Sequence, residues 1–408
     1  MPSALPDGVP APLDGSLPES ALAGAEAAAR PFGFYVHVPY CASRCGYCDF
    51  NTYTAAELGG GASQAGYAGD AVAEIRLARK VLGDVDRPVR TVFFGGGTPT
   101  LLPAAELGRI LSAIRDEFGL APGAEVTTEA NPESVDLRYL AQLREAGFTR
   151  LSFGMQSVRS HVLAVLDRRH TPGRAQECVA EARAAGFDHV NLDLIYGTPG
   201  ESDEDWQSSL DAAVAAGPDH VSAYSLIVEQ GTRIAGRIDR GELPLPDDDL
   251  LADRYLMADA TLTGAGLGWY EVSNWAASYE ARCHHNELYW TGADWWGAGP
   301  GAHSHVGGVR WWNVKHPAAY AERLTAGRSP AQAREILTDE DRRIERILLE
   351  LRLKDGCPLS LLHDKGLAAA ERAVAEGLLD PGSFDTRHAV LTLKGRLLAD
   401  AVVRDLVD

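Results

Sequence analysis

Three cysteines close together are the residues of this chain best suited to metal chemistry. In "FYVHVPYCASRCGYCDFNTYT", which begins at Phe34, Cys41, Cys45 and Cys48 are separated by three and then two residues. Structural zinc sites take four ligands, usually as two pairs, and no second Cys pair or close His pair accompanies these three. Three thiolates on one loop fit instead a 4Fe-4S cluster in which one iron lacks a protein ligand. Free buried thiols, or a zinc ion with a water ligand, are the alternatives.

Composition narrows the kinds of protein that could carry such a site. The chain has 408 residues, a formal net charge of -19 and a pI near 5.1, which argues against nucleic acid or an anionic membrane surface as a partner. Six cysteines are too few for a disulfide framework. The sequence contains no run of about 18 apolar residues, so we predict no transmembrane segment. We therefore expect a cytoplasmic protein.

The segments that would position the cysteines alternate between strand and helix patterns. Six short runs rich in β-branched and aromatic residues predict strands, and they begin at Phe34, Thr91, Glu125, Arg150, His189 and His220. Between them lie segments of helical period that end near glycine, for example residues 67–83, 102–119 and 173–186. Repeated strand–helix units predict a parallel sheet, either as a barrel or as a doubly wound layer.

A polar or glycine-rich segment follows each predicted strand. The cysteines follow the first, and the others are followed by "GGGTPT", "EANPES", Gln156, "YGTPG" and "VEQGT". In α/β barrels the active site lies at the carboxyl ends of the strands, so we expect these six segments to converge. The predicted fold class is α/β, a partial (β/α)6 barrel that is open on one side for a large ligand.

The cysteine spacing, with aromatic Tyr47 directly before Cys48, resembles the signature of the radical S-adenosylmethionine (SAM) enzymes. "GGGTP", which begins at Gly95, resembles the second-strand motif of that family. The resemblance implies that SAM chelates the open iron through its amino and carboxylate groups. It also implies an electron donor such as a flavodoxin or ferredoxin, because one electron from the cluster cleaves the sulfonium to a 5'-deoxyadenosyl radical.

Further residues resemble the oxygen-independent coproporphyrinogen oxidases, called HemN, and their relatives. This resemblance implies a SAM-binding set of Tyr35, Tyr47, Gly96, Gly97, Thr98, Glu129, Gln156, Arg168 and Asp193, and it leaves open whether one or two SAM molecules bind. The chemistry of three of these side chains suits the role. Glu129 can accept from an ammonium, Asp193 can hold a ribose diol or a second ammonium, and Arg168 can bind a carboxylate with two parallel hydrogen bonds.

Two features distinguish this chain within that group. Phe50 stands where the oxidases carry a further cysteine, and "HHNELYW" matches the H-N-x-x-Y-W pattern of the heme-chaperone branch, HemW. The resemblance implies a heme site of His285, Asn286, Tyr289 and Trp290, with His285 as a candidate axial ligand. Seven of the eight tryptophans lie between Trp269 and Trp312. These aromatics could form a porphyrin surface, or they could close the side of the barrel, with His285 hydrogen-bonded in a core.

We therefore predict four regions: a disordered leader (1–31), a radical SAM partial barrel (32–265), an aromatic-rich extension that closes the barrel side (266–330) and a small winged-helix-like α+β domain (331–408). The function that the resemblance implies is a heme chaperone that passes heme to an acceptor protein and carries a 4Fe-4S cluster with SAM. Two alternatives stay open, namely an oxygen-independent coproporphyrinogen III oxidase and a zinc-stabilised binding protein.

Overall fold

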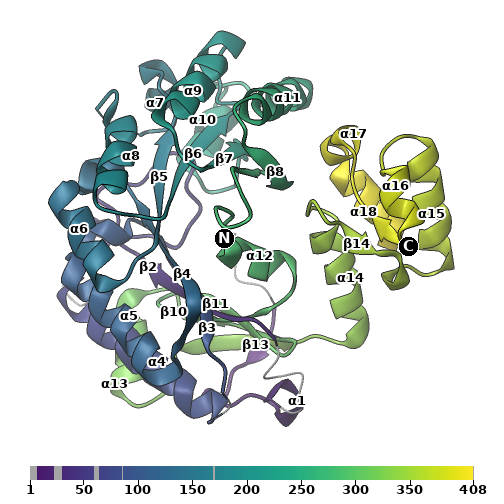
Figure 1. Ribbon diagram of the computed structural model, residues 1–408. Helices are drawn as coiled ribbons and strands as arrows, with labels where there is room; N and C mark the ends of the chain where they lie inside the picture. Colours follow the sequence, from purple (N-terminus) through teal and green to yellow (C-terminus); the bar gives the residue numbers. More distant parts are fainter. Residues whose placement is uncertain (1–6, 23–29, 59–63, 85, 169–170, 408) are drawn as a thin grey trace.

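The computed structural model describes residues 7–22, 30–58, 64–84, 86–168 and 171–407. Its main feature is one mixed β-sheet that curves around a hollow interior, with helices on the convex side (Figure 1). The strand order is β1-β13-β12-β11-β10-β2-β3-β4-β5-β6-β7-β9-β8. Because this order has two ends, the described strands form an open sheet, as expected for a partial barrel.

Six parallel strands at the centre of the sheet confirm the six predicted ones. They are β2 (Phe32–Val38), β3 (Val89–Gly96), β4 (Leu120–Ala130), β5 (Arg150–Gln156), β6 (His189–Tyr196) and β7 (His220–Ser225). The main helices that connect them are α4 (Gln64–Leu82), α5 (Ala104–Phe118), α6 (Leu137–Ala146), α8 (Arg174–Ala184) and α9 (Asp203–Ala216). A seventh parallel strand, β10 (Asp294–Ala298), pairs with β2, and the sequence patterns did not predict it.

Side chains alternate along the central strands between the helix-covered face and the interior. On β5, Leu151, Phe153 and Met155 are fully buried in the hydrophobic core beneath the helices. Arg150 and Ser152, the intervening residues, line the interior. The outer face of the sheet therefore holds the core, and its inner face carries polar and aromatic groups.

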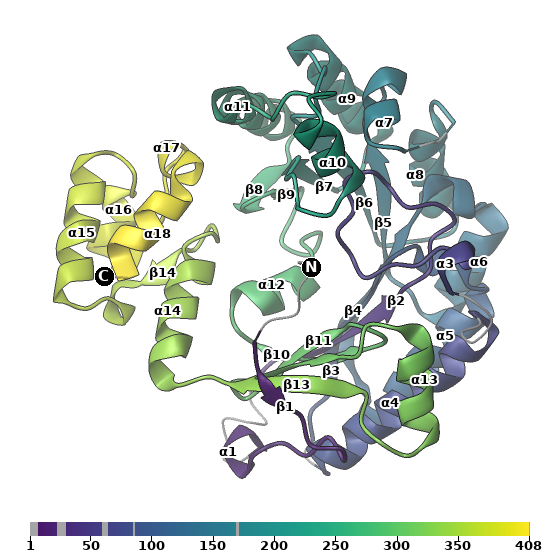
Figure 2. The same cartoon turned by 180° about the vertical axis from the view of Figure 1, so that it is seen from behind.

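The predicted extension, residues 266–330, contributes to both edges of this sheet. β8 (Gly268–Glu271) and β9 (Asn274–Ala276) pair beyond β7, whereas β11 (His303–Val306) and β12 (Val309–Asn313) follow β10. Between the two edges, α12 (His284–Trp290) crosses the interior side of the sheet (Figure 2).

The predicted disordered leader is wrong for residues 7–22. β1 (Val9–Pro10) pairs with β13 (Ala331–Ile336), and Ala21 is fully buried. Apolar leader residues thus cover part of the sheet edge, and backbone pairing satisfies polar groups that the edge would otherwise expose. Residues 1–6 and 23–29 lie outside the described residues.

The small C-terminal domain begins after the predicted boundary at residue 331, because β13 belongs to the large sheet through its pairing with β12. The domain has its own hydrophobic core and an α+β content. It comprises α14 (Asp339–Glu350), α15 (Asp364–Ala375), α16 (Pro381–Asp385), α17 (Leu393–Leu397), α18 (Ala399–Val407) and the pair β14 (Cys357–Pro358) and β15 (His388–Ala389). Arg396 fixes it to the barrel, since it pairs with Asp259 at 3.2 Å and lies 3.6 Å from the centre of the Trp269 ring. None of the described helices is long and apolar enough to span a membrane.

Candidate functional site

The three cysteines lie on a loop that follows β2 and is held from several sides. Gly46 donates its N–H to the carbonyl of Leu166 at 2.9 Å and accepts from the N–H of Ile234 at 3.0 Å. The Tyr47 side chain packs against an apolar cluster that includes Val162 and Leu166. Cys41, Cys45 and Cys48 are half-buried and form no disulfide. The backbone therefore presents the three thiols from a fixed frame.

The thiol chemistry suits a ligand role. Burial raises the pKa of Cys41 to about 11, so this thiol keeps its proton at neutral pH until a metal displaces it. Arg168 Nη1 donates to Cys45 Sγ at 3.6 Å, a cation placed to offset thiolate charge. In the described ranges no three His, Cys, Asp or Glu side chains are arranged around a single metal ion. Cluster ligation does not require that arrangement, because each cysteine of a 4Fe-4S cluster binds a different iron.

The glycine loop after β3 lies directly against the cysteine loop. Gly97 and Thr98 donate their N–H groups to the carbonyls of Val38 and Tyr40, at 2.8 and 2.7 Å. A Cβ on Gly97 would lie 2.4 Å from the Tyr40 carbonyl oxygen, so a larger residue would push the two loops apart. An ammonium can only donate, so the loop would meet a ligand ammonium through its carbonyl oxygens.

Gln156, the last residue of β5, has the backbone geometry of a functional position. Its φ is +63° although it is not glycine, a conformation that costs free energy and that concentrates at binding sites. Its side chain is buried and Oε1 has no hydrogen-bond partner among the described residues. An acceptor that is buried without a donor is poised for a ligand N–H or O–H group.

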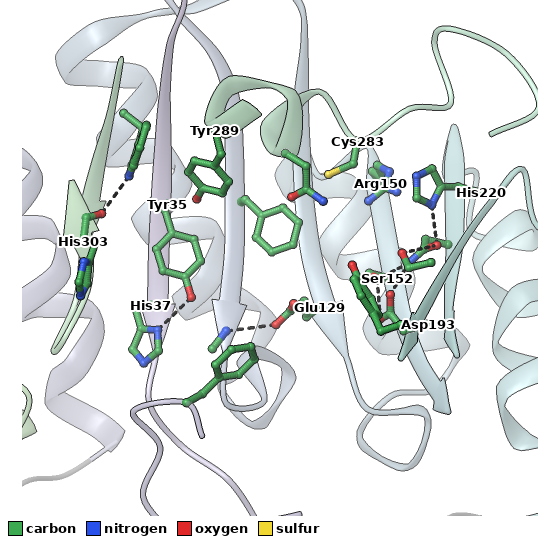
Figure 3. Close-up of a pocket in the computed structure, with 18 residues that line it drawn as sticks. Tyr35, His37, Glu129, Arg150, Ser152, Asp193, His220, Cys283, Tyr289 and His303 are labelled. Atoms are coloured by element: carbon green, nitrogen blue, oxygen red, sulfur yellow. Dashed lines mark hydrogen bonds between the residues drawn. The ribbon is translucent and has the colours of Figure 1, made fainter. Parts of the chain in front are cut away.

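A cavity of about 310 Å³ occupies the interior of the sheet (Figure 3). This volume lies within the range of small-molecule sites. Of the predicted SAM-binding set it collects Tyr35, Gly96, Glu129 and Asp193, and of the predicted heme set it collects Asn286 and Tyr289. Phe50 also lines it and is 47% exposed.

The remaining predicted residues lie around this cavity rather than on its wall. Arg168 lines a separate hollow beside the cysteine loop, and it reaches back to donate to the Gly154 carbonyl at 3.0 Å. His285 and Trp290 are absent from the cavity lining. The structure thus brings together part of each predicted set.

Glu129 is the acidic group nearest the glycine loop. It accepts the N–H of Gly96 at 3.1 Å. Burial, helped by the negative charge of Asp193, raises the pKa of Glu129 to about 8. The carboxyl is therefore mostly protonated at neutral pH, and a bound ammonium would favour its ionised form.

Tyr35 and His37 form a fixed pair on β2, on the other side of β3 from Glu129. His37 Nε2 lies 2.9 Å from the Asn51 carbonyl, which can only accept, so this nitrogen carries the proton. Nδ1 must then accept from the Tyr35 hydroxyl at 2.9 Å. Burial lowers the pKa of His37 to about 4, which leaves the ring neutral. The pair orients the Tyr35 ring towards the cavity.

Both ring nitrogens of His285 are engaged within the protein. Nδ1 lies 2.8 Å from the Thr91 hydroxyl and Nε2 lies 2.8 Å from the Tyr289 hydroxyl. The side chain is fully buried, its ring stacks on Phe93 with centroids 5.3 Å apart, and burial lowers its pKa to about 3. Iron ligation through Nε2 therefore requires the Tyr289 hydroxyl to move away first.

The cavity has two ends, which we name by their residues. The rim comprises the cysteine loop, the glycine loop Gly95–Thr98, Glu129 and Gln156, at the carboxyl ends of the strands. The floor comprises the lining residues Arg150, Ser152, Asn191, His220, Ser222 and Cys283, nearer the amino ends, and we include in it the Thr91–His285 pair, which lies outside the lining.

Sequence reasoning missed most of the floor. Its centre is a hydrogen-bond network in which the amide of Asn191 donates to Asp193 at 2.7 Å and its Oδ1 accepts from His220 Nδ1 at 2.6 Å. The signal that could have revealed it is the run of polar residues at every second position of "HVNLDLIY" and "HVSAYS". The residues between them are mostly apolar, such as Leu192 and Val221.

Comparison with known proteins agrees with this architecture. The family model of the radical SAM superfamily matches residues 35–213. A protein of Mycobacterium tuberculosis named heme chaperone HemW is 55% identical over 379 residues, which cover 93% of this chain and 95% of that one. A heme chaperone HemW of Bacillus subtilis is 30% identical over 377 residues, covering 90% and 97%. The structure of the radical SAM enzyme coproporphyrinogen III oxidase (HemN) from Escherichia coli superposes with a TM-score of 0.77 at 25% identity, covering 92% and 90%.

Proposed function

This chain belongs to the HemW family of the radical SAM superfamily, and we propose that it is a heme chaperone, which binds heme and passes it to an acceptor protein. The observation that carries the proposal is the 55% identity to a named heme chaperone over nearly the whole of both chains. We further propose that it acts in the cytoplasm with an electron donor such as a flavodoxin or ferredoxin.

We expect Cys41, Cys45 and Cys48 to hold a 4Fe-4S cluster. Three half-buried thiols on an anchored loop, with the Arg168 guanidinium against Cys45, are a suitable donor set. When bound, the cluster and SAM supply one-electron chemistry. The protein's contribution is to fix the loop, to neutralise thiolate charge and to exclude water.

The rim offers SAM an acceptor for its ammonium and a cradle of backbone atoms. Glu129 changes from a neutral to a charged acceptor when a cation approaches, because its pKa lies near 8. Gln156 offers a buried acceptor that has no hydrogen-bond partner among the described residues. Tyr35, Gly96 and Asp193 line the same cavity, and Gly97 and Thr98 hold the glycine loop against the cysteine loop.

For heme, the proposed site is the face of α12 that meets the cavity. Asn286 and Tyr289 line it directly, and His285 lies behind the Tyr289 hydroxyl. A planar ligand there would also meet the aromatic rings of Phe93 and Trp295. His285 is the candidate axial ligand once the hydroxyl of Tyr289 has moved away.

The experiment that tests this function is a heme titration of the anaerobically reconstituted protein, followed by the Soret absorption and then by transfer to an apo-hemoprotein. We expect saturable binding, and transfer that depends on this protein. Iron and sulfide analysis on the same preparation tests for the cluster, and zinc in their place would support the zinc-binding alternative. Absence of heme binding by cluster-loaded protein would overturn the proposal.

Two substitutions on α12 test whether His285 is the axial ligand of the heme iron. His285→Ala should weaken heme binding and leave the cluster spectrum unchanged, because an iron–nitrogen bond is lost. Tyr289→Phe should keep or strengthen heme binding, because it removes the hydroxyl that competes for Nε2. Unchanged heme affinity together with a lower melting temperature in His285→Ala would make this residue a packing residue.

The oxidase alternative is tested by supplying coproporphyrinogen III with SAM and a reductant. We expect no conversion to protoporphyrinogen IX, because Phe50 stands in place of the oxidases' additional cysteine and lines the cavity mouth. Robust conversion would favour the alternative.

A further inference from the structure

Arg150 at the floor of the cavity is a buried cation that forms no ion pair with any described residue. The residue is 2% exposed, and its Nε and Nη2 atoms have no hydrogen-bond partner in the part of the chain that the structure describes. No carboxylate among the described residues forms an ion pair with it within 4.0 Å. A buried guanidinium in this state is costly for the free protein, so its presence calls for an explanation.

The two nearest carboxylates are committed elsewhere. Glu125 accepts the backbone N–H groups of His284 and His285, both at 3.0 Å. Asp193 accepts from Ser152 Oγ at 2.9 Å and from the amide of Asn191. Both contribute to the field at Arg150, yet neither bonds to it. The fork of the guanidinium therefore retains its capacity to bind an anion.

Arg150 faces the cavity and not the helix layer. It lines the cavity, and Figure 3 shows it between Cys283 and Ser152. It is the first residue of β5, whereas Gln156 at the rim is the last. Six residues of parallel strand span about 20 Å, so this charge lies far from the cysteine loop.

One anion class fits these surroundings. Among the described residues that line the cavity, Arg150 is the only lysine or arginine, and burial lowers the pKa values of His37, His220 and His303. A single positive charge with a planar fork matches one carboxylate, which it can bind through two parallel hydrogen bonds. A phosphate dianion would need a second positive charge to balance it, and the described lining residues include no second lysine or arginine.

We propose that Arg150 is a carboxylate-binding residue at the closed end of the cavity. Two ligands that the family relationship brings to this cavity carry that group. Heme carries it in its propionates, and a second SAM molecule, one that does not chelate the cluster, would carry it in its aminoacyl carboxylate. Cys283, beside Arg150, is the N-cap of α12, the helix proposed for heme. The identity of the two ligands rests on the proposed function. That the bound group is a carboxylate rests on the geometry alone.

The test compares heme with heme dimethyl ester, in which both propionates are esterified, in Soret titrations of wild type, Arg150→Met and Arg150→Lys. SAM retention by the cluster-loaded proteins is measured by equilibrium dialysis. If a propionate binds Arg150, Arg150→Met should bind heme roughly 30-fold or more weakly than wild type does. The same variant should bind the ester as wild type does. Arg150→Lys keeps the positive charge and should largely restore the affinity for heme. If the aminoacyl carboxylate of a second SAM molecule binds instead, Arg150→Met should retain one SAM molecule fewer than wild type, and Arg150→Lys should largely restore it. Either pattern supports the site.

Stability provides an independent readout. Arg150→Met removes an unpaired buried charge and should leave the melting temperature unchanged or raise it. The matched control is Arg254→Met, since Arg254 is also buried but pairs with Glu201 and Asp203 at 3.2 Å outside the cavity. That variant should melt at a lower temperature and bind both ligands normally.

Other results would overturn the inference. Equal loss of heme and of its ester in Arg150→Met would mean that the residue only shapes the cavity, and unchanged binding of both heme and SAM would mean that it binds neither carboxylate. If wild type binds no heme at all, the proposed function fails, and the SAM arm alone then decides the role of Arg150.

Discussion

The rim and the floor of the cavity are built in different ways. At the rim, the functional groups lie on loops that backbone hydrogen bonds hold together, such as those from Gly97 and Thr98 to the cysteine loop. At the floor, they are side chains within strands, buried and bonded to one another, as His220 is to Asn191 and Tyr270. The rim thus presents backbone and thiols to a cofactor, whereas the floor presents a pre-formed polar wall.

Because of this difference, we expect substitutions at the rim and at the floor to have different effects. Rim thiols are only half-buried, so their removal should affect cofactor binding more than folding. The polar side chains of the floor are buried and hydrogen-bonded to one another. Removal of one therefore leaves its partner unsatisfied and lowers the free energy of unfolding before it affects ligand binding. Arg150 is the exception within the floor, because its Nε and Nη2 have no hydrogen-bond partner to lose in the described part of the chain.

The largest effect is expected at the rim. Cys45→Ala should abolish the 4Fe-4S absorption, because a ligand is deleted outright, while the melting temperature of the cluster-free protein stays near that of wild type. Iron and sulfide content and the visible spectrum measure this. Cys178→Ala is the control, since Cys178 is a fully buried helix residue away from the loop. An intact cluster in Cys45→Ala would refute the assignment of the loop.

A smaller effect, with a pH signature, is expected at Glu129. Its pKa lies near 8 in the ligand-free protein, so below that pH the binding of an ammonium must first release its proton. SAM affinity should therefore rise with pH from 6 to 8, by up to roughly 50-fold, in dialysis of cluster-loaded protein. Glu129→Gln should bind weakly, with a flat profile. The exposed control Glu177→Gln should follow wild type, and a wild-type affinity that falls over this range would contradict the ammonium role.

The sequence predicted the rim better than the floor for a physical reason. Cys41, Cys45 and Cys48, the glycine loop and Gln156 follow strand ends, where spacing and composition change abruptly along the chain. Arg150 and Asn191 lie inside strands, where alternation of polar and apolar residues looks the same whether the polar face meets solvent or a cavity. The pairing partner of a strand cannot be predicted from local sequence either, because β10 pairs with β2, which lies more than 250 residues earlier in the chain. The six central strands could be predicted because each depends on local periodicity alone.

The close approach of the two rim loops can be tested without replacing any of the three cysteines. Gly97→Ala should lower the free energy of unfolding by about 1 to 3 kcal/mol, because its Cβ would lie 2.4 Å from the Tyr40 carbonyl. It should also reduce cluster occupancy by shifting the loop. Denaturant melts and iron content measure both. Gly69→Ala in α4, where the new Cβ has only an ordinary contact at 3.6 Å, should stabilise the protein slightly.

The smallest effect is expected at the floor. Thr91→Val keeps the shape of the residue but leaves His285 Nδ1 without its 2.8 Å partner, which should cost about 1 kcal/mol of stability. The cluster spectrum should not change, because Thr91 lies near the beginning of β3 and the glycine loop follows its end. The control is Thr291→Val, whose hydroxyl is exposed and bonds only to carbonyls of its own helix; it should change stability less. A loss of cluster in Thr91→Val would mean that the floor sets the position of the rim, and the two ends of the cavity would then have to be treated as one unit.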